Sequence, residues 1–129
     1  MFYMSPNLPG AIAGIGIDLL DIDRMKLAHQ KHGDAFLTRV FTPGEIAFCT
    51  AKLNPFPSLA VRFAAKEAAF KALSQVGIRI VRWQDIAISQ SPDGVPGISV
   101  EGVTGYALHL SMSHTDKLAT AIVVIERSS

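Results

Sequence analysis

The sequence predicts an α+β fold in which a mostly antiparallel sheet packs on a long central helix and several shorter helices. Three separate helical patterns occur between residues 21 and 77 after one strand-like run, and further strand-like runs follow one another across short turns. At 129 residues, with 49% hydrophobic and 18% charged residues, the chain suffices for one domain with its own core. We expect residues 1–10 to be a leader and residues 11–129 to be this single domain.

The overall charge and apolarity exclude several classes of function. The net charge is only +1, so nothing indicates binding to nucleic acid or to an anionic membrane, and no apolar run has the length of a membrane span. The leader carries two prolines and no basic segment before an apolar one, unlike a signal peptide. The single cysteine, Cys49, excludes an intrachain disulfide and fits a reducing compartment, so we expect a cytoplasmic protein.

The first strand is predicted over residues 11–20, a short apolar run with β-branched residues. Gly14 and Gly16 interrupt it, and glycines inside a strand usually mark a bend or the close approach of another segment. Asp18 ends the run, where a bare carboxylate would be costly to bury. Because Asp21 is better placed to cap the following helix, Asp18 is left without an obvious structural task.

A first helix is predicted over residues 22–32, with Gly33 as its stop. It has a basic bias carried by Arg24, Lys26 and Lys31. Composition alone favours a solvated face, and a docking surface for an acidic protein is the alternative.

A second helix start is predicted at Thr42, because Thr caps, Pro43 suits the first helical position and Glu45 completes a capping box. The prolines of residues 54–57 end this brief helix. Ser58 is then expected to cap a long helix that ends near Gly77.

The long helix contains residues 62–73, a run of good helix formers without Pro or Gly. Phe63 and Phe70 lie seven apart, which predicts a buried stripe. Glu67 and Lys71 lie four apart and share a face, as in an ordinary surface salt bridge.

The rest of the chain alternates in the manner of strands. Residues 83–88 and 98–100 are predicted as two strands around a turn at 91–94, and residues 106–114 and 119–125 as two more.

Three features stand out as candidates for chemistry: Asp18 at a strand end, Glu67 on the long helix, and the polar residues 113–116 at another strand end. Two carboxylates from separate elements suit Mg²⁺, which typically takes one or two carboxylates together with substrate phosphates. Positive charge for those phosphates would come from Arg62, Lys66 and Lys71. Taken alone, the two carboxylates are a weak signal, and a lone histidine such as His114 is more often structural.

Four segments match known motifs in order and spacing. Residues 14–18 with Arg24 match G-x-G-x-D followed six residues on by Arg, and residues 41–45 match F-T-x-x-E. Residues 62–72 match R-(F/W)-A-A-K-E-A-x-x-K-A, and residues 113–126 match a C-terminal motif. With these motifs the chain resembles the holo-(acyl-carrier-protein) synthase family, the small phosphopantetheinyl transferases of fatty-acid synthesis.

The resemblance implies a 4′-phosphopantetheinyl transferase-like fold and transfer of 4′-phosphopantetheine from coenzyme A to a serine of apo acyl carrier protein. The product nucleotide would be adenosine 3′,5′-bisphosphate. Mg²⁺ would be held by Asp18 and Glu67. Glu67, Lys71 and His114 would be catalytic, and Arg62, Lys66, Lys71 and His114 would bind the co-substrate coenzyme A. The group that takes the serine proton stays open between Glu67, a metal-bound water and His114.

The resemblance also revives the docking alternative for the first helix, because carrier proteins are acidic. Arg24, Lys26 and Lys31 become the candidate docking residues, and the family predicts a homotrimer. Two alternatives remain beside the transferase: a Mg²⁺-dependent phosphodiesterase using the same carboxylates, and a non-catalytic binding module of the same fold.

Overall fold

The computed structural model describes residues 8–128 and has the predicted α+β architecture, so residues 1–7 of the expected leader lie outside the described part. In chain order the elements are β1 (Ile12–Asp21), α1 (Ile22–His32), α2 (Asp34–Val40), α3 (Pro43–Thr50), α4 (Phe56–Ser74), the 3₁₀ turn η1 (Trp83–Asp85), β2 (Ile86–Gln90), β3 (Pro96–Val100), β4 (Tyr106–His114) and β5 (Leu118–Arg127).

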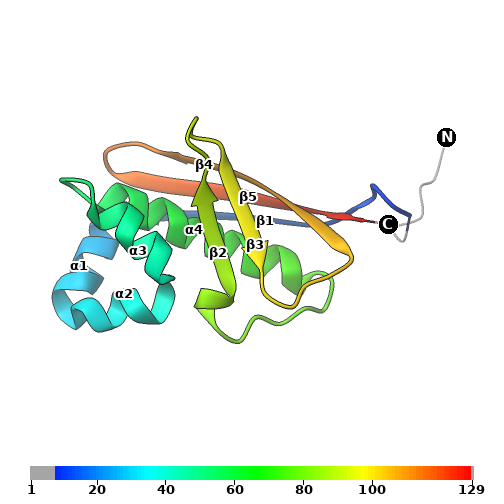
Figure 1. The fold of residues 1–129 in the computed structure, drawn as a ribbon, viewed down its shortest axis with the longest axis horizontal. Helices are drawn as coiled ribbons and strands as arrows, with labels where there is room; N and C mark the ends of the chain where they lie inside the picture. The colour runs from blue at the N-terminus through cyan, green and yellow to red at the C-terminus, as the bar shows by residue number, and fades with distance from the viewer. Residues whose placement is uncertain (1–7, 129) are drawn as a thin grey trace.

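The strands form two antiparallel sheets. The larger has the order β1-β5-β4, with Ile17 opposite Ile122 and His114 opposite Ala119. The smaller is the β2–β3 hairpin, which lies beside the long strands (Figure 1). One face of the larger sheet packs on α4, whereas the apolar side chains of Ile15, Ile17 and Leu19 on the other face are exposed.

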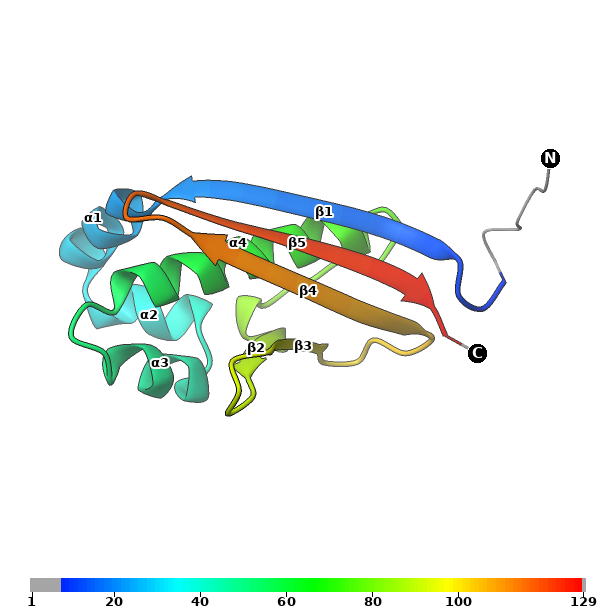
Figure 2. The ribbon, with the colours of Figure 1, turned by 90° about the horizontal axis from the view of Figure 1, so that it is seen from above.

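The helices pack below the sheet and at one of its ends. Figure 2 shows α4 running along one face of the long strands, while α1, α2 and α3 gather at the end where β1 passes into α1. One buried cluster joins α4 to β5 and β2, and a second joins α1, α2 and α3 to the start of α4. Within residues 8–128, no helix is both long enough and apolar enough to cross a membrane.

Gly14 and Gly16 let β1 approach α4 at backbone distance. A Cβ atom built on Gly16 would lie 1.8 Å from the carbonyl oxygen of Ala68, and one on Gly14 would lie 2.5 Å from that of Ala72. The prediction of a close approach at these glycines is confirmed. The alanines on the facing side of α4 also permit this close approach, because their side chains are small.

The predicted start of α3 is confirmed and the predicted start of α4 is wrong. Thr42 and Glu45 form the full capping box, with hydrogen bonds of 3.2 and 2.7 Å between each side chain and the other residue's backbone N–H. The long helix begins at Phe56, with Pro55 rather than Ser58 at the N-cap position, because a proline fits the first turn where no N–H is needed. It ends at Ser74, three residues before Gly77.

The predicted burial of Phe70 is also wrong. Its side chain is 38% exposed, whereas Phe63 is half-buried and both rings lie about 6 Å from Trp83, at 5.8 and 6.0 Å. Small residues rather than phenylalanines form the core face of α4, since only they allow the sheet to come this close. The sequence pattern also missed α2, which follows α1 directly after Gly33.

Candidate functional site

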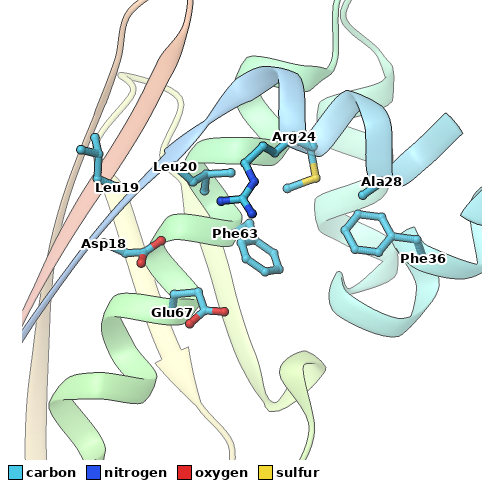
Figure 3. A pocket seen from close by; sticks show the side chains of 9 residues that line it. Asp18, Leu19, Leu20, Arg24, Ala28, Phe36, Phe63 and Glu67 are labelled. Carbon is cyan, nitrogen blue, oxygen red and sulfur yellow. The ribbon is translucent and has the colours of Figure 1, made fainter. Parts of the chain in front are cut away.

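A cleft of about 420 Å³ lies where the end of β1, the first turns of α1 and the middle of α4 meet. Figure 3 shows Asp18 and Glu67 directed into the same space, with the guanidinium of Arg24 entering from α1. The apolar part of the wall is formed by Leu19, Leu20, Met25, Ala28, Phe36 and Phe63. The two carboxylates that the sequence singled out are therefore brought together.

The charge in this cleft favours a bound cation. The pKa of Glu67 is raised, first because burial removes water from the carboxylate and second because the negative charge of Asp18 is close; the Lys71 ammonium lowers it in part. Carboxylate oxygens are the ligands that Mg²⁺ commonly uses, and a cation here would offset the cost of keeping Glu67 ionised beside a second carboxylate. The residues present thus fit the ion that the sequence implied.

Lys71 is attached to β1 rather than to Glu67. Its Nζ donates to the carbonyl oxygen of Ile17 at 2.9 Å and to Asp18 Oδ1 at 3.2 Å. The Lys71 side chain is 51% exposed, while that of Asp18 is 17% exposed. One turn further along α4, the side-chain amide of Gln75 bonds both the N–H and the carbonyl oxygen of Ile15, at 2.9 and 2.8 Å.

A second, smaller pocket of about 150 Å³ joins the start of α4, the β2–β3 hairpin and the end of β4. Arg62 and His114, both predicted to bind the co-substrate, line it together with Ser113, Lys52, Ser58, Val61, Gln90, Gly94, Pro96 and Met112. Lys52 and Gln90 were not found from the sequence, because neither stands in a recognisable motif.

Arg62 is only 2% exposed, and several contacts hold its guanidinium in place beside this pocket. Its Nη1 donates to the carbonyl oxygen of Ser58 at 3.3 Å, and its Nη2 donates to Gln90 Oε1 at 3.1 Å. The guanidinium also lies over the ring of Phe48, 4.4 Å from the centroid, while Nε has no hydrogen-bond partner within residues 8–128. A buried guanidinium with an unused donor is suited to an anionic ligand.

Lys66 departs from its predicted place in the co-substrate site. Its side chain is 0% exposed, and its Nζ pairs with Glu45 Oε1 at 2.8 Å. It further donates to the carbonyl oxygens of Trp83 and Ile86. The sequence could not separate Lys66 from Arg62 and Lys71, because all three are cations on one helix. Packing buries both Arg62 and Lys66, and only Lys66 has its charged group paired with a buried carboxylate.

The predicted docking residues lie on the exposed side of α1, and only one of them reaches the cleft. Arg24 lines the cleft, Lys26 Nζ lies 5.7 Å from the ring centroid of Phe56, and Lys31 is exposed in the last turn of the helix. The sequence pattern missed the apolar wall beside Arg24, although Met25 and Ala28 share a face of the helix at a spacing of three.

Comparison with known proteins gives consistent matches over most of the chain. The profile of the 4′-phosphopantetheinyl transferase superfamily matches residues 14–123. A holo-[acyl-carrier-protein] synthase of Koribacter versatilis is 40% identical over 124 residues, covering 89% of this chain and 98% of that protein. The corresponding protein of Chlamydia muridarum is 44% identical over 117 residues, covering 88% and 94%.

Solved structures of similar proteins have the same fold. A holo-(acyl-carrier-protein) synthase from Bacillus anthracis, in complex with CoA (3′,5′-ADP), is 33% identical with a TM-score of 0.77, covering 91% of this chain and 98% of that chain. A holo-[acyl-carrier-protein] synthase from Helicobacter pylori, in complex with coenzyme A, is 34% identical with a TM-score of 0.76, covering 87% and 99%.

Proposed function

The chain belongs to the 4′-phosphopantetheinyl transferase superfamily, and from that premise we propose that it acts as a holo-(acyl-carrier-protein) synthase. It transfers 4′-phosphopantetheine from coenzyme A to a serine of apo acyl carrier protein in fatty-acid synthesis. The observation that carries this proposal is the pairing of Asp18 with Glu67 in the cleft beside Arg24. In this proposal residues 11–129 act as one transferase domain.

In this reaction the serine oxygen attacks the pantetheine-side phosphorus of the pyrophosphate. The new bond joins that phosphorus to the serine oxygen, and the phosphoanhydride bond breaks to release adenosine 3′,5′-bisphosphate. The serine proton passes to a base, for which Glu67 and His114 are the candidates. Glu67 lies in the cleft, where burial raises the pKa of its carboxyl group, and His114 lines the second pocket.

Mg²⁺ is the cofactor in this proposal, held by Asp18 and Glu67. It would neutralise negative charge on the pyrophosphate, which favours attack by an oxygen nucleophile. Lys71 binds Asp18 and is half-exposed, so its ammonium can also meet a phosphate oxygen at the mouth of the cleft. Lys71 thereby stabilises charge on the leaving phosphate.

The nucleotide half of coenzyme A binds in the second pocket in this proposal. Support comes from Arg62, whose buried guanidinium has a free Nε, and from His114 on the same wall. These two residues bind phosphate oxygens and hold the nucleotide while the reaction proceeds about the cleft. Lys66 has no part in this binding, because it is buried against Glu45.

The acidic carrier protein docks on α1 in this proposal, through Arg24, Lys26 and Lys31. Arg24 lines both this surface and the metal cleft, so a carrier held there presents its serine to the pyrophosphate. The apolar wall of Met25 and Phe36 offers a contact for apolar side chains of the carrier. Basic residues around such a wall speed and orient the approach of an acidic partner.

We further propose that the protein assembles as a homotrimer through the outer face of its larger sheet. Ile15, Ile17 and Leu19 are 50%, 61% and 63% exposed there, and Ile122 opposite Ile17 is 38% exposed. An apolar face of this kind is typical of a subunit interface. Sedimentation should give a trimer for the native chain and monomers for Ile17→Lys.

The buried free thiol of Cys49 is consistent with the cytoplasmic location that we propose.

The function is tested by mass spectrometry of the carrier. Purified protein with coenzyme A, Mg²⁺ and apo acyl carrier protein should add one phosphopantetheine mass to the carrier, and it should add none when Mg²⁺ is chelated. Unmodified carrier with every acyl carrier protein tested would refute the proposal. Hydrolysis of coenzyme A without carrier would instead identify a phosphodiesterase.

A further inference from the structure

A buried ion pair lies at the centre of the molecule, outside both pockets' chemistry. Lys66 and Glu45 come from α4 and α3, and their side chains are 0% and 1% exposed. The Glu45 carboxylate also accepts from the backbone N–H groups of Thr42 and Ile88, each at 2.7 Å. All the acceptors and donors of the pair are therefore used inside the protein, which is the condition for burying two charges.

The hydrogen bonds of this pair converge on the β2–β3 hairpin. Lys66 donates to the carbonyl oxygen of Ile86, and Glu45 accepts from the N–H of Ile88, so two alternate residues of β2 are fixed to the helices. In the described part of the chain, residues 8–128, the hairpin is a separate two-stranded sheet with no backbone ladder to the larger sheet. The buried pair thus fixes the position of β2 along the strand axis relative to α3 and α4.

The same strand carries Gln90, which completes the second pocket. Gln90 Oε1 accepts from Arg62 Nη2, and Gln90 Nε2 donates to the carbonyl oxygen of Gly94 at 3.3 Å. Gln90 lies two residues beyond Ile88, the residue that Glu45 holds. A shift of β2 relative to α4 would therefore break the contact that orients the guanidinium of Arg62.

We infer that Lys66 and Glu45 are positioning residues for the nucleotide pocket: they hold β2 so that Gln90 can orient Arg62. The inference rests on the proposed function for the identity of the ligand, since Arg62 is the residue proposed to bind the nucleotide phosphates. It assigns a role to a motif lysine that lies between two site residues in sequence yet contacts no open pocket. It also explains why Glu45, on a different helix, belongs to the same functional unit.

The test measures binding of adenosine 3′,5′-bisphosphate by calorimetry to four forms of the full-length protein. These are the native chain, Gln90→Ala, Lys66→Met and the double variant. Gln90→Ala changes an exposed residue and removes the hydrogen bond from Arg62 to Gln90. It should weaken binding about tenfold, which is the effect of losing one hydrogen bond to a charged group. Lys66→Met keeps the length of the side chain and should weaken binding at least as much.

The double variant decides whether Lys66 acts through Gln90. If it does, the double variant binds as weakly as Lys66→Met alone, because the contact is already lost. Losses that multiply would show two independent effects and overturn the inference. Unchanged binding in Gln90→Ala would overturn it as well. Absence of binding to the native chain would refute the proposed function and with it this inference, whereas native binding with unaffected variants refutes the inference alone.

Two controls separate positioning from a general loss of stability. Leu73→Ala removes a fully buried side chain elsewhere on α4 and should destabilise the protein without weakening nucleotide binding to the folded state. In steady-state kinetics, Gln90→Ala should raise the KM for coenzyme A and leave the KM for carrier protein within twofold. An equal rise in both KM values would indicate a general disturbance and contradict the inference.

Discussion

Replacing Gly16 with alanine would place a methyl group against the backbone of α4. The new Cβ atom would lie 1.8 Å from the carbonyl oxygen of Ala68 and 2.8 Å from its carbonyl carbon. Both contacts are to backbone, so no side chain can rotate away. The separation must widen from 1.8 Å to at least 3.0 Å, and either β1 or α4 must move to allow it.

The cost of this movement follows from the packing around it. Ala68, Ala69 and Ala72 on α4 are 0% exposed and belong to the main core cluster, so a displaced helix loses contact along its whole length. Insertion of atoms into a packed core typically costs 1–3 kcal/mol, and a backbone clash belongs at the upper end, about 3 kcal/mol. For a chain of this size that loss lowers the melting temperature by about 10 °C.

The displacement should also reach the candidate metal site. Asp18 lies two residues beyond Gly16 on the same face of β1, and Glu67 directly precedes Ala68. A change of about 1 Å in the separation of such groups can lower turnover about 100-fold. The residual folded enzyme should therefore transfer phosphopantetheine much more slowly at the same Mg²⁺ concentration.

Thermal melting and the carrier mass assay test both effects, with Gly44→Ala as a matched control. Gly44 lies in the first turn of α3, and the nearest atom to a Cβ there is Thr42 Oγ1 at 4.0 Å. Because alanine favours helix, Gly44→Ala should melt at the native temperature or slightly above it. A Gly16→Ala protein that melts within about 2 °C of the native chain would refute the packing argument.

Four further predictions concern the cleft. Glu67→Gln should abolish turnover, and full activity would exclude Glu67 as a metal ligand. Without Mg²⁺ this variant should melt at or slightly above the native temperature, because burial and Asp18 disfavour the ionised carboxylate that it removes. Since the pKa of Glu67 is raised, the folded state binds the proton more tightly than the unfolded chain, so the metal-free protein should be stabilised at acid pH and lose that stabilisation as pH rises through the raised pKa. A proton on Glu67 also competes with a bound metal ion. With Mn²⁺ as a spectroscopic substitute for Mg²⁺, electron paramagnetic resonance should show that the Mn²⁺ concentration for half-saturation rises as pH falls through the same pKa. A half-saturation concentration that does not change with pH would contradict this prediction. Arg24→Glu should raise the KM for carrier about tenfold and leave the KM for coenzyme A unchanged, whereas the reverse pattern would argue against docking on α1.

Local chemistry made part of the structure predictable. The capping box at Thr42 and Glu45 involves residues three apart, so its contacts are written in adjacent sequence. The glycine pair in β1 requires a close neighbour for a steric reason, and that neighbour proved to be α4. The fold class and the family were confirmed, while the roles of the individual site residues stay predictions.

Burial that depends on distant segments could not be predicted. Lys66 and Lys71 look equivalent in the sequence, but of the two only Lys66 bonds to η1 and β2, through the carbonyl oxygens of Trp83 and Ile86. The same holds for Phe70, whose spacing from Phe63 suggested a core stripe that the approach of β1 excludes. Gln90 reaches the second pocket only because the chain folds back on itself after α4, and Lys52 reaches it from the loop between α3 and α4.

The attachment of α4 side chains to β1 limits how copies of this chain can associate. Strand β1 is at the edge of its sheet, and Gln75 and Lys71 already occupy the N–H and carbonyl oxygen of Ile15 and the carbonyl oxygen of Ile17. Another strand could add to this edge only by displacing those three hydrogen bonds, so β-augmentation and edge-to-edge aggregation are disfavoured. The surface left for the proposed association of subunits is the side chains on the outer face of the sheet, and contacts between such faces can form a closed oligomer.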